Sequence, residues 1–349
     1  MKYVKIVKII VMLWTISVIA CACTGEKNAD ADMSMPDYGK PQAVENREGT
    51  SNIYKISKNS MIKAASISSV SEIAYDAENN VAVYVDAKST GINLVNNIIR
   101  VVTPSKEKIL DKFYSASDIK LSSDGQKVAY RTYKKDSYDS AEGLKIYDIK
   151  NNNYVHMNTK VLVSGSLYRW QNDNEILYYG IKSKSNGKIY NYNIKSGSES
   201  VYFDDINGIC MFFLPLNDDL VYYEKNGDDT ILYYKTSKGK YVISKNFSGI
   251  YDGIFDGSKT IYFTACEKDN DKVSLYSFSS DSKKLKRITY DFPYSVDGYG
   301  GIGTDKNNNV YFCGFSTQKS SKNDIYYYDT LSESINVVSA HSGNYKIFD

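Results

Sequence analysis

The sequence predicts an all-β protein, and two observations lead to that prediction. From Asn52 onward the chain is a succession of short segments rich in Tyr, Val and Ile, separated by clusters of Asn, Asp, Gly, Ser and Lys. Runs of β-forming residues bounded by turn residues are typical of strands joined by tight connections. The same order of turn and strand types also recurs six times along the chain. A two-layer sandwich contains many short strands too, but it does not predict that repetition.

The repeated element is a polar turn that leads into an apolar and aromatic strand. Its copies lie at 77–85, 123–131, 172–180, 217–224, 256–264 and 305–313. One tyrosine marks each copy, with spacings of 46, 49, 44, 39 and 49 residues between Tyr84, Tyr130, Tyr179, Tyr223, Tyr262 and Tyr311. A second strand, rich in tyrosine, follows each copy, and weaker strands lie on either side. Four short strands at a period in the forties predict the blades of a β-propeller.

The two ends of the repeat region indicate how the ring of blades closes. Residues 52–76 and 325–349 share one layout, which runs from a third strand through a fourth into a first strand. We therefore expect the strand at 345–348 to pair with the N-terminal hairpin, so that both termini build the closing blade. Third strands number seven and turn motifs six. We favour seven blades, the closing one short of a strand, over six blades with an accessory hairpin. Closure of the ring matters because an open sheet edge would expose unpaired backbone groups.

One repeat carries a recognisable motif. The stretch SSDGQKVAY (122–130) resembles the core motif of TolB-type and related bacterial propeller repeats. In that family a first strand runs into a Ser-Pro-Asp-Gly turn and an apolar strand follows, whereas here Ser123 stands in place of the proline. The other repeats keep looser copies of the turn. The resemblance covers residues 52–349 as architecture, and it implies a blade without implying an activity.

The N-terminus resembles an export signal with a site for lipid attachment. Three lysines lie within the first eight residues, and the apolar run that follows spans 9–20. A membrane-spanning helix needs about 20 apolar residues, so this shorter run predicts a signal peptide. Val18-Ile19-Ala20-Cys21 resembles the bacterial lipobox, which implies cleavage before Cys21 and a diacylglyceryl group on its thiol. Lipidation at Cys23 and a signal peptide without any lipid are the alternatives.

These patterns divide the chain into three parts. Residues 1–20 are the expected lipoprotein signal peptide, residues 21–50 the lipidated Cys21 with a flexible tether, and residues 51–349 a single propeller domain. Polar composition, with Pro36 and Pro41, predicts the tether. The expected location is the extracytoplasmic face of the cell membrane, where the lipid anchor would hold the protein at the cell surface.

Charge and composition exclude several functions. The chain has 43 Lys+Arg against 41 Asp+Glu and no basic block beyond residue 8, so a nucleic-acid partner is not expected. With His156 and His341 as its two histidines, it has little material for a metal site or a Ser/His/Asp triad. We expect neither a cofactor nor a metal. Cys210, Cys266 and Cys313 lie in apolar strands, which predicts buried free thiols.

The candidate site follows from the fold. First strands line the central channel of a propeller, so six charged residues are expected to face it: Glu72, Asp118, Lys120, Arg169, Asp252 and Lys346. Such a ring of mixed sign could hold a small polar ligand, or its members could bind water and one another. The 33 tyrosines could form a surface for sugars or peptides. Their recurrence at the same place in each repeat favours packing between sheets.

Two functions of different classes remain. The first is a non-catalytic binding or scaffold module with a protein or glycan partner, because loops from every blade converge on one face of a propeller. The second is a propeller-type lyase or glycosidase that acts on extracellular polysaccharide. Such an enzyme needs paired carboxylates, or a His/Tyr/Arg set, on the channel loops. The chain offers carboxylates without a diagnostic spacing, so binding is the favoured hypothesis.

Overall fold

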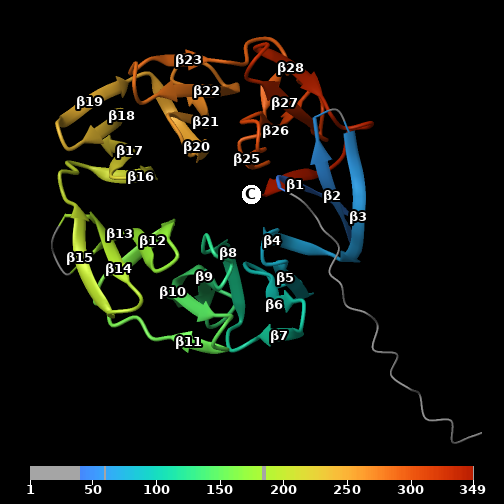
Figure 1. Cartoon of the computed structure of the whole chain (residues 1–349), viewed down its shortest axis with the longest axis vertical. Coiled ribbons are helices and arrows are strands. Elements are labelled where there is room, and N and C mark those ends of the chain that lie inside the picture. Colours follow the sequence, from blue (N-terminus) through green and yellow to red (C-terminus); the bar gives the residue numbers. More distant parts are fainter. Residues whose placement is uncertain (1–39, 59, 183–185, 349) are drawn as a thin grey trace, which may run out of the picture. The chain divides into compact units, whose positions relative to one another are not determined.

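The computed structural model describes residues 40–58, 60–182 and 186–348. Within them, seven antiparallel sheets surround a common axis (Figure 1), which confirms the prediction of an all-β, seven-bladed propeller. The described residues contain one short 3₁₀-helix, η1 (Tyr138–Ser140). No helix in this part of the chain has the length and apolar character needed to cross a membrane.

Each blade has four strand positions, counted outward from the channel. The first strands are β4 (Val70–Asp76), β8 (Ser115–Leu121), β12 (Leu162–Asn172), β16 (Ile209–Leu216), β20 (Phe247–Phe255), β24 (Ser295–Val296) continued by β25 (Ile302–Thr304), and β29 (Tyr345–Phe348). The second strands are β5 (Val81–Ser89), β9 (Lys127–Tyr133), β13 (Glu175–Ile181), β17 (Asp219–Asn226), β21 (Thr260–Glu267), β26 (Val310–Phe315) and β1 (Gln42–Arg47).

The outer half of each blade completes the sheet. The third strands are β6 (Asn96–Thr103), β10 (Ala141–Asp148), β14 (Lys188–Asn193), β18 (Asp229–Thr236), β22 (Val273–Ser279), β27 (Asp324–Asp329) and β2 (Thr50–Ser57). The fourth strands, on the outer rim, are β7 (Lys106–Leu110), β11 (Asn153–Val155), β15 (Ser198–Phe203), β19 (Gly239–Ser244), β23 (Leu285–Arg287), β28 (Ser334–Val337) and β3 (Ser60–Ser68). We number the blades 1 to 7 from the one that begins with β4.

Tyrosine packs the space between blades. All six tyrosines that mark the repeat lie in second strands and are buried. Aromatic residues that face each other across second and third strands also stack. Tyr222 and Tyr233 are register partners with ring centroids 5.1 Å apart, and Tyr311 and Tyr327 are partners at 5.8 Å. Such cross-strand pairs stabilise a sheet while the phenol hydroxyl reaches a polar partner. Packing therefore accounts for most of the tyrosine content.

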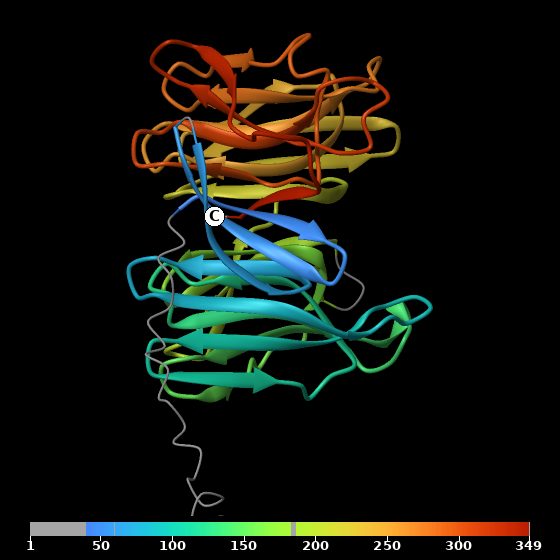
Figure 2. The same ribbon diagram turned by 90° about the vertical axis from the view of Figure 1, so that its right-hand side faces the viewer.

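Blade 7 closes the ring with strands from both termini. Its order is β29-β1-β2-β3, and β29 pairs with β1 over four register pairs, from Gln42 with Phe348 to Glu45 with Tyr345. Figure 2 shows the blue strands of this blade between those of blades 1 and 6. Its inner strand also contacts blade 6, because the Ile347 N–H donates to the Gly300 carbonyl at 2.7 Å. The expected closure by both termini is confirmed.

Two details of the predicted closure are wrong. The propeller begins by Gln42, so part of the segment 21–50 that was expected to be tether is strand β1. The closing blade therefore has all four strands and is not short of one. The physical reason is local: β1 has two apolar residues, Ala43 and Val44, and no alternation over its six residues. Pairing with β2 on one side and β29 on the other makes it a strand.

A buried carboxylate links the termini at this closure. Glu45 of β1 is 4% exposed and accepts hydrogen bonds from the Tyr54 hydroxyl at 2.8 Å and the Asn52 amide at 3.3 Å. It also pairs with Arg47 at 2.9 Å and with Nε2 of His341, in the approach to β29, at 3.2 Å. Burial alone would raise the pKa of Glu45. The hydrogen bonds, that from Arg47 foremost, outweigh burial and lower the pKa to about 2.

This carboxylate predicts how the closure responds to acid. Because the pKa of Glu45 is lower in the folded protein than in the unfolded chain, its contribution to stability is complete above about pH 4.5 and disappears as pH falls towards 2. Glu45→Gln should lower the free energy of unfolding by about 1–3 kcal/mol at neutral pH. The difference between wild type and Glu45→Gln, measured by urea denaturation, should shrink towards pH 2. A difference that stays constant over that range would contradict the assignment.

Candidate functional site

The channel has two different ends. At the end that we call the entry face, each fourth strand leads into the next first strand and each second strand leads into a third. At the opposite end, the exit face, first strands lead into second strands. All six predicted channel residues lie on first strands and are half-buried. Glu72 lies on β4, Asp118 and Lys120 on β8, Arg169 on β12, Asp252 on β20 and Lys346 on β29.

Three of these side chains bind the backbone of the next blade's first strand. The Glu72 carboxylate accepts the N–H groups of Asp118 and Ile119 at 3.0 and 2.9 Å. Nζ of Lys120 donates to the carbonyl oxygen of Tyr168 at 2.7 Å. Nε of Arg169 donates to that of Phe213 at 2.9 Å. These contacts hold blades 1 to 4 together around the channel. They agree with the alternative in which the charged residues bind the protein itself and no ligand. A ligand site at these residues stays a prediction.

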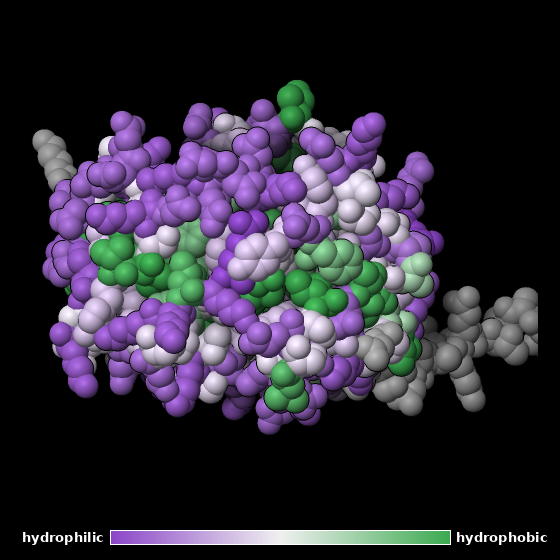
Figure 3. Space-filling model, turned by 90° about the horizontal axis from the view of Figure 1, so that it is seen from above, coloured by the Kyte–Doolittle hydropathy of each residue, from purple (hydrophilic) through white to green (hydrophobic). Residues whose placement is uncertain are grey.

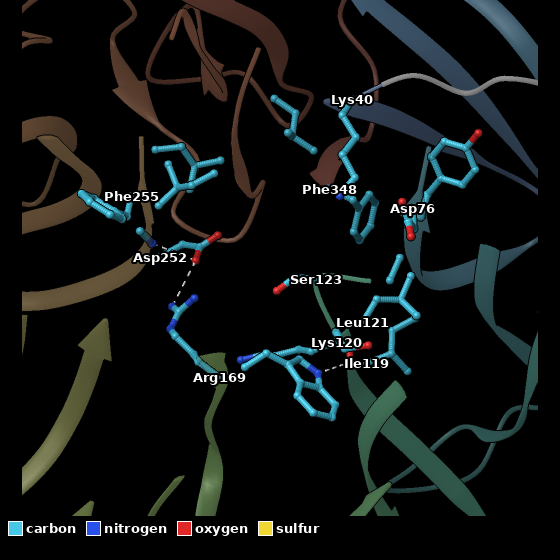
Figure 4. A pocket seen from close by; sticks show the side chains of 18 of the residues that line it. Lys40, Asp76, Ile119, Lys120, Leu121, Ser123, Arg169, Asp252, Phe255 and Phe348 are labelled. Carbon is cyan, nitrogen blue, oxygen red and sulfur yellow. Dashed lines mark hydrogen bonds and ion pairs between the residues drawn. The ribbon is translucent and has the colours of Figure 1, made fainter. Parts of the chain in front are cut away.

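The six residues do not form one cluster. Lys120, Arg169 and Asp252 line a cavity of about 450 Å³ where first strands leave the channel, and we call it the exit-face pocket (Figure 4). Nη2 of Arg169 lies 3.7 Å from Oδ1 of Asp252, on the other side of the channel. Lys40 and Phe348 lie together at another edge of the pocket. Glu72, Asp118 and Lys346 do not line this cavity.

Burial changes the protonation of the channel charges. It lowers the pKa of Lys120 to about 7, and the positive charge of Arg169 adds to that effect. Burial also lowers the pKa of Arg169 and raises that of Glu72. For Glu72, the two backbone N–H groups favour the carboxylate and partly oppose the rise. Shifts of this kind mark a region where charge is poorly solvated.

β-Bulges interrupt several of the first strands and leave large side chains exposed there. Register shifts occur in β4, β8, β12, β16 and β20. In β16 and β20 the bulged residues are Met211 and Tyr251, and Tyr299 lies between β24 and β25. Their exposed fractions are 51%, 38% and 81%. The rings of Tyr251 and Tyr299 pack edge to face with centroids 5.6 Å apart. Because bulges re-aim side chains at functional positions, blades 4 to 6 present an aromatic and apolar wall.

The opposite wall of the channel is polar. The bulge of β8 holds Asp118 at a φ of 60°, a left-handed conformation that is uncommon for residues other than glycine. Its carboxylate lies 3.0 Å from Nε of Arg131 on the neighbouring second strand. The channel therefore combines an acidic and basic side in blade 2 with an aromatic side in blades 4 to 6.

Exposed apolar residues are concentrated at the entry face. Eight large hydrophobic residues that are more than a third exposed lie at strand ends or connections on this face: Ile92, Val95, Tyr138, Leu162, Ile181, Ile209, Tyr290 and Phe292. At the exit face, the described residues of this class comprise Leu331 alone. The remainder are Met211 and Tyr251 at bulges, Tyr299 between β24 and β25, and six residues on fourth strands. Figure 3 shows hydrophobic side chains in a band at mid-height on one side of the molecule.

The aromatic wall was not predicted from the sequence. A bulge adds one residue to a strand, so the alternation of inward and outward positions does not reveal Met211 or Tyr251. A signal is present in the glycines nearby: a Cβ atom on Gly298 would lie 2.8 Å from the ring of Tyr251. A glycine at that position permits the close approach of the two aromatic segments.

The remaining predicted chemical groups have structural surroundings. Cys210, Cys266 and Cys313 are buried and form no disulfide, which confirms the expected free thiols. Within residues 40–58, 60–182 and 186–348, no three or more His, Cys, Asp or Glu side chains gather in a way that could hold a metal ion. Cys21 lies outside the described residues.

Comparisons with known proteins identify the fold. An uncharacterized protein from Listeria monocytogenes matches with a TM-score of 0.56 and 13% identity, over 87% of this chain and 93% of that protein. The β-propeller domain of the Trilobed protease from Pyrococcus furiosus matches with a TM-score of 0.54 and 15% identity, over 78% and 85%. TolB from Acinetobacter baumannii also resembles the chain, with a TM-score of 0.47 and 10% identity over 88% and 82%.

Several matching structures are peptidases of which this chain spans about half the length. The chain spans 44% of an acylaminoacyl peptidase from Pyrococcus horikoshii and 53% of dipeptidyl peptidase 4 from Porphyromonas gingivalis. No protein-family model and no curated protein matches the sequence. At these identities the likeness shows the propeller fold alone.

Proposed function

We propose that the chain is a membrane-anchored extracytoplasmic lipoprotein whose propeller binds a protein partner through its entry face without catalysing a reaction. The binding part of this proposal rests on the exposed apolar residues, which are concentrated at the entry face and scarce at the exit face. The entry face exposes Tyr138, Tyr290 and Phe292 among its apolar residues, and aromatic side chains are enriched at the centres of protein interfaces, where a partner excludes water from them. A spread of apolar groups over several blades suits a protein surface better than a single sugar ring.

The use of the channel carboxylates supports binding over catalysis. A glycosidase needs one carboxyl group to move a proton and a second to act as base or nucleophile. Here both oxygens of Glu72 accept backbone N–H groups, and Asp118 pairs with Arg131. Carboxylates held in this way join neighbouring strands. The enzyme alternative would require them to release these partners when substrate enters.

Membrane attachment rests on the lipobox resemblance of Val18-Ile19-Ala20-Cys21. We expect Cys21→Ala to abolish incorporation of a fatty-acid analogue in cells and to move the protein from the membrane fraction to the medium. Cys23→Ala is the matched control and should leave both properties unchanged. Lipid labelling that persists in Cys21→Ala but is lost in Cys23→Ala would transfer the anchor to Cys23. Labelling that persists in both variants would contradict Cys21 as the single site of lipid attachment.

The docking surface predicts a selective loss of binding. Leu162→Ser, Ile209→Ser and Tyr290→Ser, combined in one variant, should weaken binding of the partner captured by cross-linking on intact cells at least tenfold, since each anchor of this kind is typically worth about 1 kcal/mol or more. These entry-face side chains are exposed by 77%, 59% and 61%, so the fold should tolerate the changes. The thermal unfolding midpoint checks that it does.

The outer rim supplies a control of similar exposure. Ile62→Ser, Val201→Ser and Val242→Ser change residues that are exposed by 62%, 49% and 53% on fourth strands. This control variant should retain the partner. Equal losses in the two variants would contradict an entry-face site. Hydrolysis or elimination of a polysaccharide that stops in Glu72→Gln or Asp118→Asn would replace the proposed binding module by an enzyme.

A further inference from the structure

The exit-face pocket has the features of a small-molecule site and lies at the other end of the channel from the proposed docking surface. Its volume of about 450 Å³ is within the range of ligand pockets. Charged groups converge on it from three first strands, with Lys120, Arg169 and Asp252 labelled in Figure 4. An apolar pocket with a few convergent polar groups is the usual arrangement for binding an organic ligand.

The charges in this pocket do not balance. The positive charge of Arg169 disfavours the charged form of Lys120, and Lys40 adds a third cationic side chain at the edge. Asp252 is a single carboxylate that lies 3.7 Å from Arg169. The other acidic group of the lining, Asp76, already accepts the N–H of Glu78 and both hydrogen-bond donors of Asn79. With three cationic side chains and two carboxylates in its lining, the pocket has a formal excess of one positive charge.

Hydrogen-bond donors of Lys120 and Arg169 remain available to bind an anion that would balance this charge. Nζ of Lys120 donates to the carbonyls of Tyr168 and Ser166 at 2.7 and 3.3 Å, and an ammonium has a third hydrogen. The guanidinium of Arg169 has five N–H groups and uses Nε for Phe213. A planar carboxylate matches a guanidinium well because two parallel hydrogen bonds can form.

Apolar side chains complete the lining. Trp170, Phe255, Ile347 and Phe348 border the same cavity. The indole of Trp170 is held in place by its N–H, which donates to the Lys120 carbonyl at 2.9 Å. Inorganic anions have no apolar body to place against these groups, whereas an organic acid has one.

We propose that the exit-face pocket binds a small organic carboxylate, with its carboxylate between Lys120 and Arg169 and its apolar body against Trp170 and Phe255. The site is separate from the entry face, so it can be present whether or not the docking proposal holds. A bound carboxylate balances the excess positive charge of the lining, whereas the negative charge of Asp252 repels the bound carboxylate.

The protonation of Lys120 makes this binding sensitive to pH. Arg169 of β12 faces the ammonium and lowers its pKa, while Asp118 of β8, Asp252 of β20 and Glu72 of β4 act in the opposite direction. With a pKa of about 7, Lys120 is half neutral at pH 7 in the free protein. An anion favours the charged form, so binding takes up a proton. Affinity should be greatest below pH 7 and should fall by up to about tenfold per pH unit above it.

Isothermal titration calorimetry of the full chain tests the proposal with three probes: 3-phenylpropionate, its neutral isostere 3-phenylpropionamide, and inorganic phosphate. We expect 3-phenylpropionate to bind at least tenfold more tightly than either of the others. The measured heat should depend on the ionisation enthalpy of the buffer at pH 7.5, which reports proton uptake. Absence of 3-phenylpropionate binding at millimolar concentration, or equal binding of the amide, would overturn the proposal. Phosphate binding of equal strength would reduce the site to one for inorganic anions and would also overturn it.

Variants with opposite effects locate the site. Arg169→Gln should weaken 3-phenylpropionate binding at least tenfold, and Asp252→Asn should tighten it several-fold because it removes the opposing charge. Arg287→Gln is the matched control: Arg287 lies on the fourth strand β23 of blade 5 and pairs with Glu267, away from the channel. It should leave the affinity unchanged. Weakening by both Arg169→Gln and Asp252→Asn would indicate that the ion pair only maintains the fold, and it would contradict the proposal.

Discussion

The pairing of β29 with β1 is the constraint on which the rest of this structure depends. Four register pairs join the two ends of the described chain, and the hydrogen bond from Ile347 to Gly300 attaches β29 to blade 6. With this pairing, each first strand has a neighbouring blade on both sides, and the channel becomes a closed space. Glu45 adds a polar contact at the same place, because it binds His341 from the C-terminal segment.

Closure allows the charged residues of the channel to act between blades. Glu72, Lys120 and Arg169 each bind backbone atoms of the following first strand, at sequence separations of 44 to 48 residues that correspond to one repeat. The first strands of the next two blades, β16 and β20, carry the bulges at Met211 and Tyr251. One set of strands thus supplies the contacts that hold the ring and the side chains that give its two ends different chemistry. The entry half is aromatic and apolar, and the exit-face pocket is rich in positive charge.

Most of the fold could be predicted from the sequence, because second and third strands repeat a strong pattern of turns and tyrosines. The closing strand β1 could not, since its six residues take their structure from strands on both sides. The charged channel residues were placed on the correct strands by their position in the repeat. The exposure of Met211 and Tyr251 depends on bulges of one residue, which alternation does not show. That of Tyr299 depends on the interruption between β24 and β25, which the repeat does not show either. A binding module would use the exposed apolar side chains of the entry face, whereas an enzyme would use the channel carboxylates.

Native-state hydrogen exchange of the full chain, followed for individual amides, tests the central role of closure most directly. If β1 and β29 form one cooperative unit, the amides of Ala43 to Glu45 and Tyr345 to Ile347 should exchange with the same free energy of opening, and that free energy should fall together as denaturant is added. The inner strand β4 of the adjacent blade should lose protection with them. Exchange of the β29 amides at the rate of a frayed terminus, while β1 and β4 remain protected, would contradict the account.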